Sequence, residues 1–364
     1  MTKVLILVHG MGVHPPGWSQ EIVDKLDAVA DQYPTFNGKQ KFHERVDIRE
    51  ISYDAVFTNI VGTWQSDASQ LDAWAKASGR ELPKLVGWLR SPLPSDAKGF
   101  FWSTAIQPLL YRGFHLVRDA VRASVTDQIA TIANDVLANG SAEITVLSHS
   151  LGTMVTHDSL DLLGRGYKGN EVLAATRWGF TNLFMLADVC QLARKLTADI
   201  DYFDSVVRPS TAGKAGETYC QFFINVWHRF DPFAVSAAFR PGTWGGNYIP
   251  IGPLGHFHNA NVHGFTHYLD HPLVHAPLIN AALGPGPDGR FPISDADQNA
   301  VLAAYPVTTA KGCDAPIASV KDAAIALASA TDVEETIIGV SQFLASAKQA
   351  ADVCTALASK DMFI

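Results

Sequence analysis

The segment Ile144–Gly152, which reads ITVLSHSLG, constrains the fold of this chain more than any other feature of its sequence. It begins as a short apolar and β-branched run, which is typical of a strand buried on both faces of a parallel sheet. Small residues, Ser148 and Gly152, stand two positions before and after Ser150, and apolar residues at a helical spacing follow from Met154 to Leu163. We therefore predict a tight strand-to-helix turn that carries Ser150 at the carboxyl end of a sheet, over the N-terminus of a helix.

Other segments have the composition of strands, and helical patterns separate them. The clearest helix has apolar residues every three or four positions from Phe114 to Val136, ends at Asn139-Gly140 and leads into the strand Glu143–Leu147. Strands that alternate with helices predict the α/β class, with an open, mostly parallel sheet flanked by helices. The remaining predicted strands are Val4–Val8, Val46–Tyr53, Asn182–Leu186, Tyr219–Trp227 and Tyr248–Ile251.

The composition excludes several classes of protein. Of the 364 residues 47% are hydrophobic and 18% are charged, which excludes disorder as the main state. The net charge is -8 and no Lys/Arg cluster occurs, so we expect no nucleic-acid partner. No apolar run is long enough for an integral membrane segment or for the core of a signal peptide. The default expectation is a cytoplasmic protein, with export by a route that needs no signal peptide left open.

The four cysteines are too widely spaced for a zinc pair or for a dense disulfide framework. They are Cys190, Cys220, Cys313 and Cys354. We expect buried thiols, and a single bridge between Cys313 and Cys354 is the alternative because both lie in the C-terminal region.

Two regions fall outside the regular alternation of strands and helices. Residues 55–108 carry four of the eight tryptophans, and we interpret them as a helical cap insertion that lines an apolar pocket or, alternatively, as a helical pair packed on the sheet edge. From residue 283 the chain is rich in Gly and Pro and then in Ala. We predict a domain over residues 1–282 and a helical extension over residues 283–364 that packs on it. A role of this extension in an oligomer contact is the alternative, and the oligomeric state stays open.

A second motif, His9-Gly10-Met11-Gly12, follows the first predicted strand. Together with the turn at Ser150, it makes the chain resemble the α/β-hydrolase superfamily, and within it the lipase-like and esterase-like serine hydrolases. The resemblance covers roughly Lys3 to Leu278, and the chain departs from the G-x-S-x-G pattern because Ser148 replaces the first glycine.

The resemblance implies a nucleophile, an acid and a histidine in that chain order, with Ser150 as the nucleophile. It also implies that the backbone N–H groups of Met11 and Leu151 form an oxyanion hole. The loop residues Gly10 and Gly12 would allow this arrangement, with His9 and His149 in supporting structural roles.

The acid must then follow a later strand. Asp231 stands in Asp-Pro, in the turn that follows the predicted strand Tyr219–Trp227, which fits the acid-bearing loop of the family. Asp188 at the end of Asn182–Leu186 is the alternative acid, and its structural interpretation is a helix N-cap. Asp231 itself has the alternative interpretation of a turn residue.

The base is harder to choose, because six of the thirteen histidines lie between His256 and His275. His263 comes after the last predicted strand and before a helix, where the resemblance places the catalytic histidine. His267 is the alternative base, and His256 and His258 are further alternatives.

A metal site is the competing interpretation of these histidines, because four of them are spaced by four residues. They are His263, His267, His271 and His275. Pro272 prevents one unbroken helix from carrying all four, and no cysteines or carboxylates converge on them in sequence. We therefore expect no metal and no other cofactor.

These residues predict a serine hydrolase that cleaves carboxylic esters through an acyl-enzyme intermediate. The expected substrate is a small-molecule or lipid ester. An amidase, a thioesterase or a lipid-degrading effector would use the same three residues, and a non-catalytic interaction module on the same fold is the alternative from another class.

Overall fold

The structure of the protein is a computed structural model, and it describes twelve continuous stretches of the chain together with single residues between 335 and 353. The stretches are 1–12, 14–59, 115–138, 140–166, 180–191, 207–209, 220–231, 233–234, 238–242, 244–256, 262–306 and 312–329.

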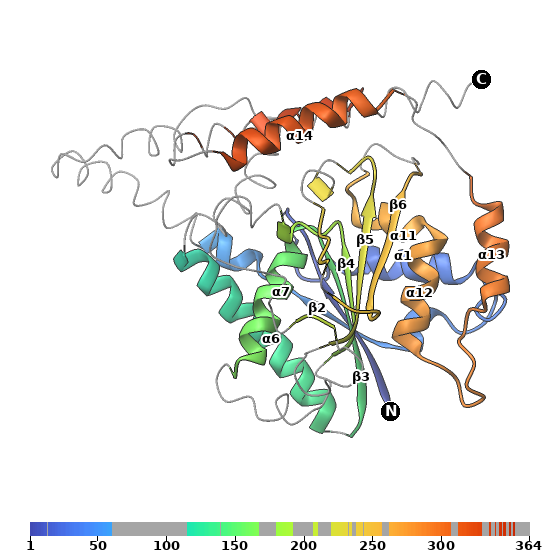
Figure 1. Ribbon diagram of the computed structural model, residues 1–364. Helices are drawn as coiled ribbons and strands as arrows, with labels where there is room; N and C mark the ends of the chain where they lie inside the picture. Colours follow the sequence, from blue (N-terminus) through green and yellow to red (C-terminus); the bar gives the residue numbers. More distant parts are fainter. Residues whose placement is uncertain are drawn as a thin grey trace.

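Six strands form one sheet in the order β2-β1-β3-β4-β5-β6, and all neighbouring pairs are parallel (Figure 1). The prediction of an α/β architecture with a parallel sheet flanked by helices is confirmed. The strands are β1 Thr2–Val8, β2 Asp47–Ile51, β3 Ala142–His149, β4 Phe180–Leu186, β5 Cys220–His228 and β6 Tyr248–Leu254.

Helices cover both faces of this sheet. In Figure 1, α6 (His115–Ala138) and α7 (Leu151–Gly164) lie on one face, and α1 (Gln20–Ala30) and α12 (Pro272–Leu283) lie on the other. Further helices are the 3-10 turn Phe42–Glu44, α11 Phe265–Asp270, α13 Asp295–Ala304 and α14 Asp314–Ala328. The chain therefore forms three layers, as a sheet with two apolar faces requires.

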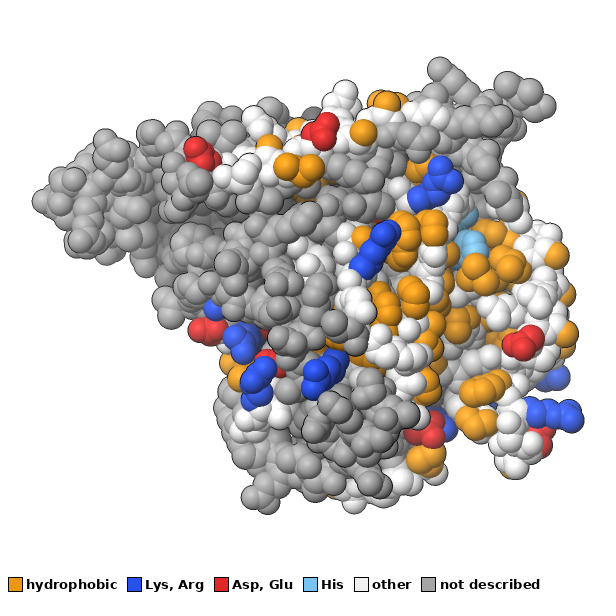
Figure 2. Space-filling view, in the orientation of Figure 1, with side chains coloured by type: hydrophobic (Ala, Val, Ile, Leu, Met, Phe, Trp, Pro, Cys, Tyr) orange, Lys and Arg blue, Asp and Glu red, His pale blue; other side chains and the backbone are white. Residues whose placement is uncertain are grey.

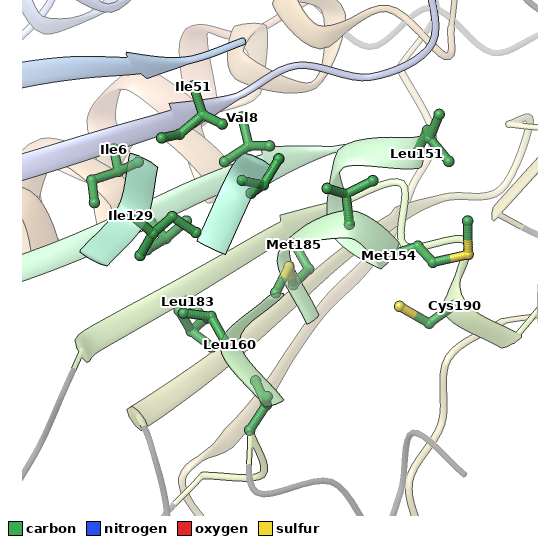
Figure 3. Close-up of a cluster of buried hydrophobic side chains, with 14 of the residues drawn as sticks. Ile6, Val8, Ile51, Ile129, Leu151, Met154, Leu160, Leu183, Met185 and Cys190 are labelled. Carbon is green, nitrogen blue, oxygen red and sulfur yellow. The ribbon is translucent and has the colours of Figure 1, made fainter. Parts of the chain in front are cut away.

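The alternation of side chains along β1 explains why both faces are covered. Val4, Ile6 and Val8 pack with α6 and α7, whereas Leu5 and Leu7 pack with α1 and α12. Successive side chains of a strand point to opposite faces, so an all-apolar run needs a partner layer on each side. Figure 3 shows the first of the two clusters, in which side chains of β1, α6 and α7 interdigitate.

The sheet order creates a switch point between β1 and β3. The chain goes from β1 to β2 on one side and then returns to place β3 on the other side of β1. Loops that leave the carboxyl ends of two such strands diverge, and a crevice for a ligand forms between them in open α/β sheets. The loop after β1 and the turn at Ser150 after β3 both lie at this point.

In the C-terminal region the structure describes the helices α13 and α14, and α14 crosses the carboxyl ends of the strands in Figure 1. Phe343 from this region packs into the core and meets Phe233 at a ring distance of 5.5 Å. Residues 60–108 of the predicted cap lie outside the described residues.

The structure describes three of the four cysteines. Cys190 and Cys220 are buried free thiols, as predicted. Cys313 is disulfide-bonded, so the expectation of a thiol is wrong for this residue and the alternative of a bridge applies to it. Cys354 lies outside the described residues.

The described surface is partly apolar. In Figure 2, hydrophobic side chains gather over the region of β5, β6 and α12, where Ile249 and Leu273 are exposed. None of the described helices combines the length and the apolarity needed to cross a lipid bilayer.

Candidate active site

Ser150 occupies a strained turn between the last residue of β3 and the first residue of α7. Its φ of 54° and ψ of -125° are unusual for a residue with a side chain. Two backbone hydrogen bonds hold the turn: the Ser150 N–H donates to Leu186 O at 3.0 Å, and the Thr153 N–H donates to Ser150 O at 2.9 Å. The strain is thus fixed by β4 on one side and by the first turn of α7 on the other.

The serine that departs from the glycine pattern is accommodated by a hydrogen bond. Ser148 Oγ lies 2.7 Å from Thr156 Oγ1, and both side chains are buried. The extra hydroxyl therefore has a partner one turn into α7, and the turn keeps its shape without the glycine.

Two glycines allow the loop after β1 to approach this turn closely. A Cβ at Gly152 would lie 2.2 Å from the carbonyl oxygen of His9, and a Cβ at Gly10 would lie 2.8 Å from Ser150 Cβ. The close approach puts the His9-Gly10-Met11-Gly12 loop directly beside Ser150. Met11 is half-buried there, and Leu151 is the first residue of α7.

The structure brings Ser150, His263 and Asp231 together in one hydrogen-bonded series. His263 Nε2 lies 2.7 Å from Ser150 Oγ, and His263 Nδ1 lies 2.8 Å from Asp231 Oδ2. Asp231 follows β5, and His263 lies between β6 and α11, so three different loops at the carboxyl edge of the sheet supply the three residues. These partners favour the tautomer in which Nδ1–H donates to the carboxylate and Nε2 accepts the serine proton.

Asp231 is fully buried, and four donors surround its carboxylate. Oδ2 accepts from His263 Nδ1 and from the Tyr268 hydroxyl at 2.6 Å, while Oδ1 accepts from the N–H groups of Phe233 and Ala234. Burial alone would raise the pKa of Asp231, but His263 and the other donors lower it below its ordinary value. The group is therefore a stable carboxylate next to the imidazole.

His149, the residue before Ser150, supports His263 through the backbone. Its Nε2–H donates to the carbonyl oxygen of His263 at 2.6 Å, and its ring stacks on Phe265 at 5.0 Å. Burial, with a smaller effect of the nearby His263, lowers the pKa of His149 to about 3. The ring is thus neutral and adds no positive charge that would oppose protonation of His263.

His9 and Tyr53 hold the loop after β1. The Tyr53 hydroxyl lies 2.7 Å from His9 O and 3.1 Å from Gly10 O, and the His9 ring stacks on the Tyr53 ring at 4.1 Å. Sequence reasoning missed both Tyr53 and Tyr268. Tyr53 ends the predicted strand Val46–Tyr53, but nothing near either tyrosine in the sequence predicted its contacts.

The alternative site residues lie in other contacts. Asp188 Oδ1 accepts the N–H of Cys190 at 2.9 Å, as an N-cap would. The ring of His267 stacks on His256 at 4.2 Å and lies 5.4 Å from His228. His258 lies outside the described residues.

The four histidines spaced by four residues do not share one helix. His271 has an extended backbone between α11 and α12, and Pro272 is the first residue of α12. His275 lies within α12, where its ring is 2.7 Å from the Tyr33 hydroxyl. This is the break that Pro272 predicted.

No protein-family model matches the chain, and no curated protein is significantly similar to it. A serine hydroxyl hydrogen-bonded to an imidazole, whose other nitrogen meets a buried carboxylate, is an arrangement that activates the hydroxyl as a nucleophile.

Proposed function

We propose that this chain is a serine hydrolase of the α/β-hydrolase type that cleaves carboxylic esters. The observation that carries the proposal is the series Ser150 Oγ, His263 and Asp231, joined at 2.7 Å and 2.8 Å, with Ser150 in a strained strand-to-helix turn. The proposed catalytic domain spans residues 1–282, with a cap at about 55–108 and an extension over 283–364.

In the proposed reaction, Ser150 Oγ attacks the ester carbonyl while His263 Nε2 takes the hydroxyl proton. His263 then gives this proton to the leaving alcohol, which leaves the acyl group on Ser150. A water molecule, deprotonated by His263, hydrolyses the acyl-enzyme and restores the serine. Asp231 stabilises the imidazolium in both halves of the reaction.

The negative charge of the tetrahedral intermediate needs preorganised donors. The proposed donors are the backbone N–H groups of Met11 and Leu151, each worth roughly 3 to 4 kcal/mol in comparable sites. Supporting this assignment, Leu151 begins α7, and the glycine-rich loop with Met11 packs against Ser150 without room for side chains at Gly10 or Gly152.

An apolar ester is the proposed substrate class. Phe233 lies 4.5 Å from the His263 ring and contacts Phe343 of the C-terminal region, so described apolar side chains border the reacting atoms. Amide and thioester hydrolysis would use the same residues. A series of p-nitrophenyl esters from acetate to octanoate tests the substrate class, and a preference for acetate would contradict the apolar assignment.

Replacing Ser150 by Ala tests the reaction itself. We expect kcat for p-nitrophenyl butyrate to fall by about 10⁶-fold, because loss of the nucleophile removes the covalent route. The matched control is Ser159→Ala, which removes the hydroxyl of a buried serine on the same helix. Labelling by a fluorophosphonate probe should map to Ser150 and persist in the control. A parent protein that neither reacts with the probe nor hydrolyses esters would favour a non-catalytic interaction module instead.

A further inference from the structure

A second group of polar side chains lies beside the candidate active site, on the other side of the loop after β1. It consists of His9 at the end of β1, His14 before α1 and Asp54 after β2, and we call it the His9–His14–Asp54 cluster. One ligand atom from each residue lies within 4.8 Å of the other two. The parallel pairing of β1 with β2 brings His9 and Asp54 together, because both follow the carboxyl ends of neighbouring strands.

The hydrogen bond of His9 determines which of its nitrogens faces the cluster. Its Nδ1–H donates to Gly10 O at 2.9 Å, so a neutral ring has its lone pair on Nε2. In that tautomer, His9 Nε2 lies 3.8 Å from Asp54 Oδ1. Both atoms are hydrogen-bond acceptors, and neither supplies a proton to the other.

Three polar atoms of the cluster are buried without a hydrogen-bond partner among the described residues: His9 Nε2, His14 Nδ1 and Asp54 Oδ1. His14 Nδ1 lies 3.4 Å from Asp54 Oδ2, which already accepts the backbone N–H of His14. Buried polar atoms without partners are costly and rare in proteins. A group with a positive charge and no proton of its own would satisfy all three at once.

We propose that the His9–His14–Asp54 cluster binds one divalent transition-metal cation of the zinc class. Two imidazoles and one carboxylate are ligands that zinc commonly takes, and a fourth position stays open for water. The Nδ1–H bond of His9 to a backbone carbonyl is the outer contact that metal-bound histidines usually make.

Coordination requires a movement of His14. The rings of His9 and His14 are stacked at 4.0 Å and 20°, whereas tetrahedral ligands at about 2.0–2.1 Å from zinc converge on one point. His9 is held by Gly10 and by the stack on Tyr53, so His14 tilts out of the stack on binding. Its side chain is 24% exposed and lies on a loop, which leaves room for this rotation.

A second group of histidines, His228, His256 and His267, is also compact enough to hold a metal, but its hydrogen bonds argue against it. Both ring nitrogens of His228 are in use: Nε2 donates to His256 O at 2.7 Å, and Nδ1 accepts the N–H of Phe230 at 3.1 Å. No lone pair of His228 is therefore available without breaking one of these bonds. In His9 only Nδ1 makes a hydrogen bond among the described residues, so the lone pair of Nε2 is available for a metal.

The cation would fix the loop that lies against Ser150, because His9 directly precedes Gly10. If the proposed hydrolase function holds, binding would also steady the Met11 N–H; this consequence rests on that function, whereas metal binding does not. The test is therefore a binding measurement that needs no activity.

Full-length protein is first stripped of metal with a chelator and dialysed. It is then titrated with Zn²⁺ in competition with a chromophoric chelator, and the absorption of bound Co²⁺ gives a second signal. We expect one tight site per chain and a higher Tm on loading. His14→Gln and Asp54→Asn should weaken binding by at least about 10–100-fold, the loss that removal of an outer contact already causes. The Tm increase should disappear in both variants.

The controls separate this site from others. His43→Gln removes a surface histidine paired with Asp27 and should keep full binding, as should the inactive Ser150→Ala variant. The proposal is wrong if the parent takes up no Zn²⁺ or if both cluster variants bind as the parent does. It is also wrong if His267→Gln, rather than His14→Gln, removes the site. Because Ser150→Ala separates binding from hydrolysis, failure of one proposal leaves the other standing.

Discussion

The ends of β4 and β5 carry the same residue type at the same depth and give it opposite properties. Asp188 is 2% exposed and Asp231 is 0% exposed, and each follows one of two adjacent parallel strands. Asp231 has donors on both oxygens, whereas Oδ2 of Asp188 has no hydrogen-bond partner among the described residues. Burial raises the pKa of Asp188 to about 6, while the pKa of Asp231 is lowered.

The comparison shows that burial does not decide the charge of a carboxyl group by itself. Transfer out of water disfavours the carboxylate at both positions, and only the number and charge of the surrounding donors differ. His263 and Tyr268 make the difference at the end of β5. An acid that must stay ionised beside an imidazole is therefore expected at Asp231 and not at Asp188.

Among changes at the two carboxyl groups and their donors, Asp231→Asn should have the largest effect. We expect kcat for ester hydrolysis to fall by about 10⁴-fold, because an amide in place of the triad acid favours the wrong tautomer of the histidine. Asp188→Asn, the matched change on the neighbouring strand, should leave kcat unchanged. Steady-state kinetics of both purified variants would decide between the two acids, and equal losses would remove the distinction.

Asp188→Asn should instead change stability, with a definite dependence on pH. The pKa of Asp188 is raised from 3.8 to about 6, so its favourable contribution is complete below pH 3.8 and is lost as the pH rises through 6. The loss is about 3 kcal/mol, at about 1.4 kcal/mol per pKa unit. The variant should be more stable than the parent at pH 8, and the advantage should vanish near pH 4. Urea unfolding at both pH values measures this, and a difference that is the same at both would contradict the assignment.

Tyr268→Phe should have the smallest effect of the three. It removes one donor from Asp231, and we expect the free energy of unfolding to fall by about 1.5 kcal/mol, the lower end for a bond to a charged group, because three donors remain. Loss of the Tyr268 hydroxyl should also shift the pH profile of kcat/KM, because this hydroxyl donates to the carboxylate that contacts His263. Tyr33→Phe removes a hydroxyl bonded to His275, away from Ser150, and should reduce stability without moving the profile.

Much of the fold could be predicted because its signals are local. Val4–Val8 is apolar on both faces, and Ile144–Leu147 consists of apolar and β-branched residues, so their burial in a parallel sheet follows from composition. The spacing from Phe114 to Val136 gave the helix that the structure has as His115–Ala138. The order of strands could not be predicted, because pairing in a parallel sheet joins segments far apart in the chain.

The residues of the candidate site also differ in whether a local sequence pattern predicts them. Ser150 stands in a local turn pattern, and Asp231 and His263 follow strands, so position along the chain was informative. Tyr53 and Tyr268 act only through contacts with distant residues, and nothing near them in sequence predicts those contacts. The unpartnered nitrogen of His9 was hidden for the same reason, since its environment comes from β2 and from the loop before α1.

The missing side chains at Gly10 and Gly152 give the site its dimensions. A single methyl group at position 152 would overlap the His9 carbonyl, and one at position 10 would overlap the Ser150 side chain. Alanine at either position would push the β1 loop away from the turn and widen the gap in which the substrate oxygen of the proposed reaction would fit. Positions 10 and 152 therefore tolerate no side chain larger than that of glycine. A library of variants should recover glycine at both positions, whatever substrate is used for the selection.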